Sequence, residues 1–89
     1  MPINIYNDRN NEKLAWLCEA IWELPTQISE LENWLETTGK TLPVGSYIAD
    51  IGFGIRKDAS GGGSILSKKM MSIMSEIGME IYLSEYPAK

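Results

Sequence analysis

Few residues of this chain have the types and spacing that catalysis requires. The sequence contains no histidine and a single cysteine, Cys18. Without histidine the usual general base, the usual metal ligand and every Ser-His or Cys-His arrangement are missing. One cysteine can neither close an intramolecular disulfide nor supply the roughly four ligands of a structural zinc site. Because Cys18 lies on the apolar side of its segment, we interpret it as a small core residue and not as a nucleophile.

Two acidic residues, Asp50 and Glu80, fall inside segments that alternate like strands. If both segments are strands, these two acids and Tyr82 would lie on the face of the sheet opposite the apolar residues. A pair of carboxylates carries acid–base chemistry only where a cleft drives the two pKa values apart, and no spacing places this pair in one. We therefore expect a protein that is not an enzyme and that needs no cofactor or metal.

A glycine-rich stretch is the best candidate for a small-ligand site. It precedes a predicted helix, and the exposed amides of a helix N-terminus favour anions. It is not a P-loop, because Gly63 is followed by Ser-Ile-Leu-Ser where that motif has Lys and Ser/Thr. The competing interpretation is a plain connection between strand and helix. The candidate anion ligands are Gly61, Gly62, Gly63, Ser64, Ser67 and Lys68.

The elements around this stretch are the clearest part of the sequence. Apolar residues alternate along 47–55, as in a strand with one buried face. After Ser67 they recur at helical spacing as far as Gly78, and alternation then returns over 79–83. The order is strand, glycine loop, helix, strand. We expect this unit to bury Ile51, Phe53, Ile55, Ile73, Ile77, Met79, Ile81 and Leu83.

The first half of the chain permits two interpretations. Residues 2–6 predict a strand with Ile3 and Ile5 on one face. Helical spacing of Leu14, Leu17, Cys18, Ile21 and Leu24 then predicts a helix that starts at Asn7 or Asp8. A strand over 15–22 is the alternative, because the same stretch also alternates. In either case we expect Pro25 to end the element.

A further helix is predicted over 26–38. Ser29 and Glu32 have capping-box spacing, and Gly39 stands where a helix commonly terminates. Together these segments predict an α/β (α+β) fold: a three- to four-stranded sheet packed against two or three helices. A chain of 89 residues is enough for one such domain, over residues 1–89.

Charge is distributed unevenly. Residues 1–39 hold seven acidic against two basic residues, whereas residues 40–89 hold five against six, and the net charge is −4. Binding to nucleic acid is disfavoured, because phosphate contacts need a basic face. A basic protein partner is permitted. The predicted interface is the outer face of the 26–38 helix, with Glu30, Trp34 and Glu36, and the alternative is a simply solvated face.

No stretch approaches the roughly 20 apolar residues of a membrane helix, and the N-terminus lacks a basic-then-apolar signal pattern. We therefore expect a cytoplasmic protein with no membrane contact. The sequence does not indicate an oligomeric state.

The run from Gly52 to Pro87 resembles the C-terminal half of an uncharacterised bacterial family, the domain of unknown function numbered 4279. The similarity lies in the glycine loop, in Leu66-Ser67 before a helix, in Ile77-Gly78 at its end and in Ile81-Tyr82 in the last strand. That resemblance implies a small α/β protein of the kind found as immunity or antitoxin partners, which would inhibit a basic toxin. It assigns no catalytic residue.

Overall fold

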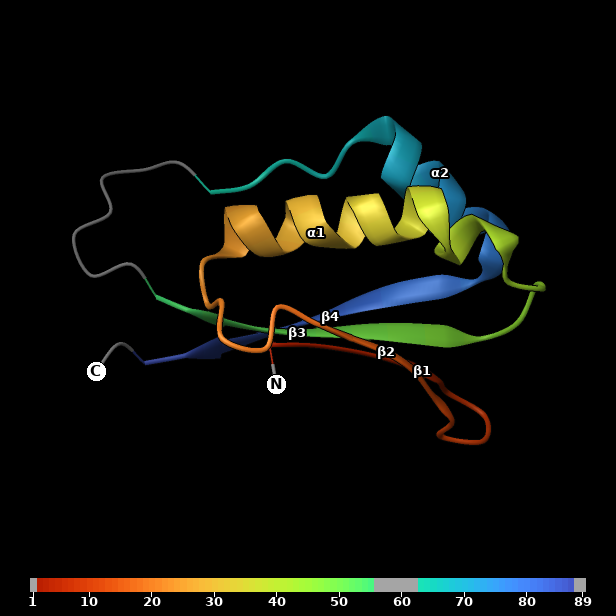
Figure 1. Ribbon diagram of the computed structural model, residues 1–89, viewed down its shortest axis with the longest axis horizontal. Coiled ribbons are helices and arrows are strands. Elements are labelled where there is room, and N and C mark those ends of the chain that lie inside the picture. Colours follow the sequence, from red (N-terminus) through yellow and green to blue (C-terminus); the bar gives the residue numbers. More distant parts are fainter. Residues whose placement is uncertain (1, 56–62, 88–89) are drawn as a thin grey trace.

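The structure is a computed structural model that describes residues 2–55 and 63–87. It forms a small compact α+β domain in which a four-stranded mixed sheet packs against two helices (Figure 1). This confirms the predicted fold class. In chain order the elements are β1 (Ile3–Asn7), β2 (Lys13–Leu17), α1 (Leu24–Thr37), the 3-10 turn η1 (Gly39–Thr41), β3 (Tyr47–Gly54), α2 (Lys68–Ile77) and β4 (Met79–Tyr86).

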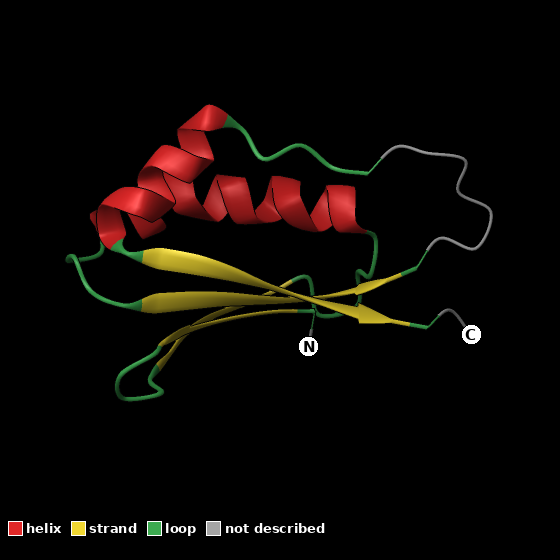
Figure 2. Cartoon of the chain, turned by 180° about the vertical axis from the view of Figure 1, so that it is seen from behind, coloured by secondary structure: helices red, strands yellow, loops and turns green. Residues whose placement is uncertain are grey.

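The strands lie in the order β2-β1-β3-β4. Strand β1 is antiparallel to both of its neighbours, whereas β3 and β4 are parallel and are joined through α2. Figure 2 shows the two layers: both helices cover one face of the sheet, and no element of the described chain covers the other. We call this second surface the uncovered face. Its residues decide the functional argument below.

The predicted strand–helix–strand unit is present. Helix α2 begins after Ser67, whose hydroxyl accepts a hydrogen bond from the Met70 amide at 3.1 Å. It ends at Gly78, which adopts the left-handed conformation that glycine tolerates best (φ 86°). The Gly78 amide donates to the Met74 carbonyl, and the Tyr47 amide donates to the Gly78 carbonyl, so this one turn ties α2 to the start of β3.

The predicted helix from Asn7 or Asp8 to Leu24 is wrong, because the chain forms a hairpin there. Asn7 and Asn10 each accept a backbone amide two residues onward, and Asn11 adopts a positive φ of 59°. These are turn features that compete with a helix. The alternative strand over 15–22 was nearer but misplaced, since β2 ends at Leu17 and Cys18 follows with a positive φ.

Pro25 does not end an element but stands in the first turn of α1. A proline is tolerated there because the first amides of a helix have no intrahelical partner. The predicted capping box of Ser29 and Glu32 is also wrong, because α1 starts earlier, with Glu23 at its N-cap and no side-chain cap.

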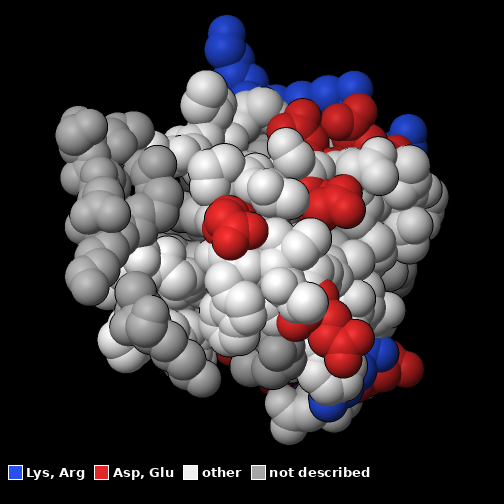
Figure 3. Space-filling model, turned by 60° about the vertical axis from the view of Figure 1, so that its left-hand side comes forward, with Lys and Arg blue, Asp and Glu red and all other residues white. Residues whose placement is uncertain are grey.

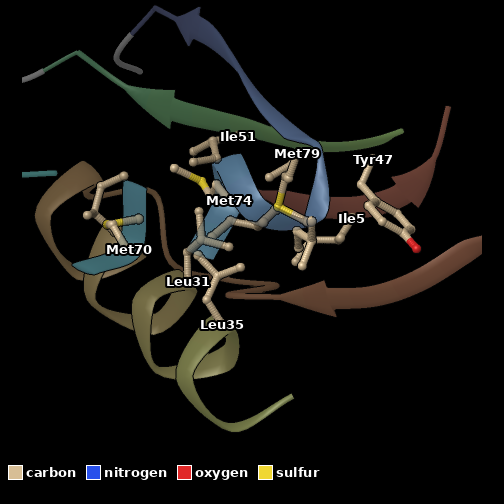
Figure 4. Packing of buried hydrophobic residues seen from close by; sticks show 12 residues of the cluster. Ile5, Leu31, Leu35, Tyr47, Ile51, Met70, Met74 and Met79 are labelled. Carbon is tan, nitrogen blue, oxygen red and sulfur yellow. The ribbon is translucent and has the colours of Figure 1, made fainter. Parts of the chain in front are cut away.

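The core lies between the sheet and the helices. Ile5 and Ile51 project from the sheet onto Leu31 and Leu35 of α1, with Met74 of α2 beside them (Figure 4). Of the eight residues expected to be buried, Ile51, Ile77 and Met79 are buried and Phe53, Ile73 and Ile81 are half-buried.

Ile55 and Leu83 were expected inside and are instead 45% and 57% exposed. Ile55 follows the last residue of β3, where the strand runs past the start of α1 (Figure 1). Leu83 is on β4, an edge strand whose far half extends beyond α2. Alternation identified the correct face of each strand, but it does not say how far along that face the helices reach.

Candidate functional site

The three predicted partner-binding residues all lie on α1, but each has a different environment. Glu30 is exposed. Trp34 is half-buried and packs against the core, where a β-carbon at Gly39 would come within 2.9 Å of its ring. Glu36 accepts a salt bridge from Lys69 of α2, with 2.7 Å between the charged atoms. Trp34 and Glu36 therefore already have partners inside the protein, and Glu30 is the most accessible of the three.

The contact between Glu36 and Lys69 shifts both titrations. The hydrogen bond from Lys69 holds the pKa of the Glu36 carboxyl below its usual value. The same bond raises the pKa of the Lys69 ammonium. The Lys69 side chain is 68% exposed and the Glu36 side chain is 33% exposed, so solvent screens the attraction between α2 and α1 at this contact.

The predicted anion site is only partly within the described chain, since Gly61 and Gly62 lie outside the described residues. Gly63, Ser64 and Lys68 are exposed. The Ser67 hydroxyl is already used to cap α2. An open cleft of about 340 Å³ lies between α1 and residues 63–67, but Glu32 is part of its lining. A carboxylate in the cleft opposes an anion, so the structure favours this site less than the sequence did.

A second open cleft, of about 230 Å³, lies where the start of α1 meets the end of β3. Its lining includes Leu24, Pro25, Phe53 and Ile55, with Glu85 as the charged residue. Within the described lining, Glu85 has no second acid–base or nucleophilic side chain beside it, and we assign the cleft no chemistry.

On the uncovered face, one row across the four strands has an aromatic side chain at each end and two polar side chains between them. Cα partners on neighbouring strands project to the same side, which places Trp16 of β2, Asn4 of β1, Asp50 of β3 and Tyr82 of β4 in one row. We call these four residues the central row. Its two ends, Trp16 and Tyr82, are 55% and 47% exposed.

The adjacent row on this face consists of Lys13, Tyr6, Ile48 and Glu80. Ile48 is only 2% exposed although no helix covers it, whereas Glu80 is exposed. Neighbouring side chains of the same face must therefore close over Ile48 and give the surface an apolar floor. The structure thus places Asp50 level with Tyr82 and one row from Glu80 on one face of the sheet, a register that the sequence pattern did not specify.

A further pair of aromatic side chains, Trp22 and Tyr86, lies near the end of β3 on the uncovered face. The Trp22 ring meets the Tyr86 ring edge to face, with 5.6 Å between centroids and 83° between planes. The Trp22 carbonyl accepts the Gly54 amide at 2.9 Å, which holds this segment beside β3 beyond the start of β1. Both rings are about two-fifths exposed.

Two polar groups at the centre of this face have no partner among the described residues. The Asn4 Oδ1 atom is buried and accepts no hydrogen bond. The Asp50 carboxylate is half-buried, and the ion pair found in the described chain is the one between Lys69 and Glu36, on the helix side. Partial burial raises the pKa of the Tyr6 hydroxyl, and the negative charge of Asp50 raises it further. Acceptors and negative charge therefore gather in the central row.

Cys18 is half-buried and follows β2 directly. Burial raises the pKa of its thiol, and the nearby Glu30 carboxylate raises it further. Since the thiolate is the reactive form, a raised pKa makes this cysteine a poor nucleophile. This agrees with its interpretation as a structural residue.

Figure 3 shows how charged side chains are distributed on one side of the molecule. On the side shown, most of the surface is uncharged, acidic side chains are spread over it, and basic ones appear along the upper and lower margins. Within the described residues no group of three or more His, Cys, Asp or Glu side chains could hold a metal ion. None of the helices in residues 2–55 and 63–87 has the length and apolar character to cross a membrane.

Sequence reasoning ranked the helix face above the uncovered face. Part of the signal was available, because Trp16 and Tyr82 fall at positions that alternate with apolar residues. The pattern does not show that both helices pack on the same side of the sheet.

In comparisons with known proteins, no family model, no curated protein and no solved structure matches this chain.

Proposed function

We propose that this protein is a non-enzymatic protein-binding module and that it docks a basic partner on the uncovered face of its sheet. The observation that carries the proposal is the exposure of four aromatic side chains on that face. Trp16, Trp22, Tyr82 and Tyr86 are each 40–55% exposed. Trp and Tyr dominate the binding energy of protein interfaces, because they bury a large area at low entropic cost.

The charges on the uncovered face indicate the sign of the partner's charge. Asp50 and Glu80 lie among the aromatic residues, and the basic side chain on the described part of this face is Lys13, whose ammonium lies 4.6 Å from the Trp16 ring centroid. A net charge of −4 adds a long-range attraction for a basic molecule. The outer face of α1 is also acidic and would likewise attract a positively charged partner. Glu30 remains a candidate residue at the rim of that helix face.

The resemblance to the domain of unknown function numbered 4279 suggests an immunity or antitoxin role, in which the module covers a basic site on a toxin. A surface that combines aromatic anchors with acidic side chains suits such an inhibitor, since the anchors slow dissociation and the charges speed association. An anion or small-molecule sensor is the weaker alternative, because Glu32 lines the cleft and Ser67 already caps α2.

The proposal is tested by affinity capture from the native host with three immobilised proteins: the wild type, a Trp16→Ala/Tyr82→Ala variant and a Val44→Ala/Leu66→Ala variant. The last is a matched control, because Val44 and Leu66 are also exposed apolar residues but lie outside the sheet. We expect a basic protein to be captured by the wild type and the control at low salt and to be lost from the sheet variant. Equal capture on all three proteins, or no capture at all, would refute the proposal.

A further inference from the structure

We propose that the central row of the uncovered face is a subsite for an arginine side chain of the partner, with Asp50 as the ion-pairing residue. This inference rests on the proposed function, because it specifies which group of the basic partner is recognised and where.

The first argument is the state of the Asp50 carboxylate. It is half-buried within a sheet and is flanked by Asn4 on β1 and Tyr82 on β4. Neighbouring strands are about 4.8 Å apart, so the three side chains emerge close together. No salt bridge or hydrogen bond from the described residues engages this carboxylate. Burying a carboxylate further against a partner is unfavourable unless the partner supplies a positive group.

The second argument is the Asn4 Oδ1 atom. It is buried, it accepts no hydrogen bond, and it belongs to the Cα partner of Asp50. An unsatisfied buried acceptor costs free energy, which a donor from a partner would recover. One planar donor group above this pair would meet the half-buried Asp50 carboxylate directly, and it would reach the Asn4 oxygen once the side chains that cover that atom move aside.

The third argument is the aromatic setting. The row ends in Trp16 and Tyr82, and Tyr6 stands near Asp50 in the adjacent row. Aromatic faces attract cations, and guanidinium groups both stack on them and pair with carboxylates. Lys13 already shows this attraction inside the protein, since its ammonium lies 4.6 Å from the Trp16 ring centroid.

These arguments favour arginine over lysine. A guanidinium presents five donors in a planar fork, so it can satisfy a carboxylate and a second acceptor at once while stacking on a ring. An ammonium is a compact and strongly hydrated charge, and it gains less from a flat, aromatic and half-open site. A phosphate or another anion would meet Asp50 and Glu80 and would be repelled.

The test uses two blocked peptides, Gly-Ser-Arg-Gly-Arg-Ser-Gly and the same peptide with citrulline at both arginine positions. Citrulline keeps the length and planarity of arginine but is neutral. Binding to the full chain is followed by amide chemical-shift changes and tryptophan fluorescence. The protein variants are Asp50→Asn and, as a matched control, Glu76→Gln, which removes an exposed carboxylate from α2 on the helix side.

We expect the arginine peptide to shift amides of residues 4, 16, 50 and 82. Its binding should weaken about tenfold with citrulline or with Asp50→Asn, the loss for one charge-assisted contact, and Glu76→Gln should have no effect. Equal binding of the two peptides, shifts centred elsewhere, or indifference to Asp50→Asn would overturn the arginine subsite. If host-protein capture still depended on Trp16 and Tyr82 in that case, the proposed function would stand without this subsite.

Discussion

The Tyr86 ring lies directly over Gly52 and meets the Trp22 ring at 83°. A β-carbon at Gly52 would come within 2.8 Å of the Tyr86 ring, so the absence of a side chain in mid-strand makes room for the aromatic pair. Close packing against the Tyr86 ring therefore accounts for the glycine at position 52 of β3. The uncovered face is built by specific residue choices in the sheet beneath it.

Gly52→Ala should displace the Tyr86 ring and separate the two aromatic residues. The expected cost is about 1 kcal/mol, at the low end for overpacking, because the ring is half-exposed and can move outward. Near-ultraviolet circular dichroism should lose part of the tryptophan signal. Gly54→Ala is the control, since its β-carbon would lie 3.8 Å from the nearest Trp22 atom, an ordinary contact. Equal effects of the two substitutions would contradict this account.

Gly78→Ala should strongly destabilise the fold. Gly78 has a φ of 86°, and a β-carbon there would collide with the carbonyl oxygen of Gly45. Strain and collision together should lower the free energy of unfolding by about 2–4 kcal/mol. Urea denaturation followed by far-ultraviolet circular dichroism measures this. A midpoint within error of the wild type would show that the turn between α2 and β4 is not as constrained as described.

Gln27 should contribute to stability through its amide. It is fully buried in α1, and its Nε2 donates to the carbonyls of Ile21 and Gly52 at 2.8 and 2.7 Å. Gln27→Leu fills a similar volume but leaves both carbonyls without that donor, so we expect a loss of about 2 kcal/mol in unfolding free energy. The same variant should loosen the Trp22 segment, which hydrogen exchange at Gly54 would detect. Unchanged exchange there would contradict the link between α1 and the uncovered face.

The ion pair between Glu36 and Lys69 predicts a pH dependence of defined sign. The folded pKa of Glu36 is lowered, so its contribution to stability is present above the unfolded pKa and is lost as pH falls through the folded pKa. The folded pKa of Lys69 is raised, so its contribution is lost as pH rises through that value. Glu36→Gln should therefore reduce the stability lost on acidification.

Urea midpoints at neutral pH and near pH 3 measure this difference. Glu30→Gln is the matched control, because Glu30 is an exposed acid of the same helix without a recorded ion pair. If both variants showed the same pH dependence, the contact with Lys69 would not be responsible. High salt should shrink the effect of Glu36→Gln, because the pair is largely exposed.

The second half of the fold was predictable because its signals are local. Alternation marks β3 and β4, helical spacing marks α2, and Ser67 and Gly78 fix the two ends of that helix. The hairpin was missed because apolar spacing in β2 fits both periods, and the decisive evidence lies in the turn residues Asn7, Asn10 and Asn11. Those asparagines are the local signal for the turn.

The candidate site was less predictable, because it depends on which face the helices cover. The exposed positions of Trp16 and Tyr82 follow only once β2, β1, β3 and β4 are assembled in that order. The pairing of Glu36 with Lys69 likewise joins two helices that are distant in sequence. Such relationships arise from tertiary packing, and a one-dimensional pattern does not contain them.

Site-specific photocrosslinking in the native host tests the central claim most directly. A photoreactive phenylalanine analogue is placed in turn at Tyr82 on the uncovered face, at Glu30 on α1 and at Val44 in the loop before β3, all of which are exposed. The account predicts a covalent adduct with a basic protein from position 82 and none from position 44. An adduct from position 30 alone would place the interface on α1 and contradict the assignment to the sheet.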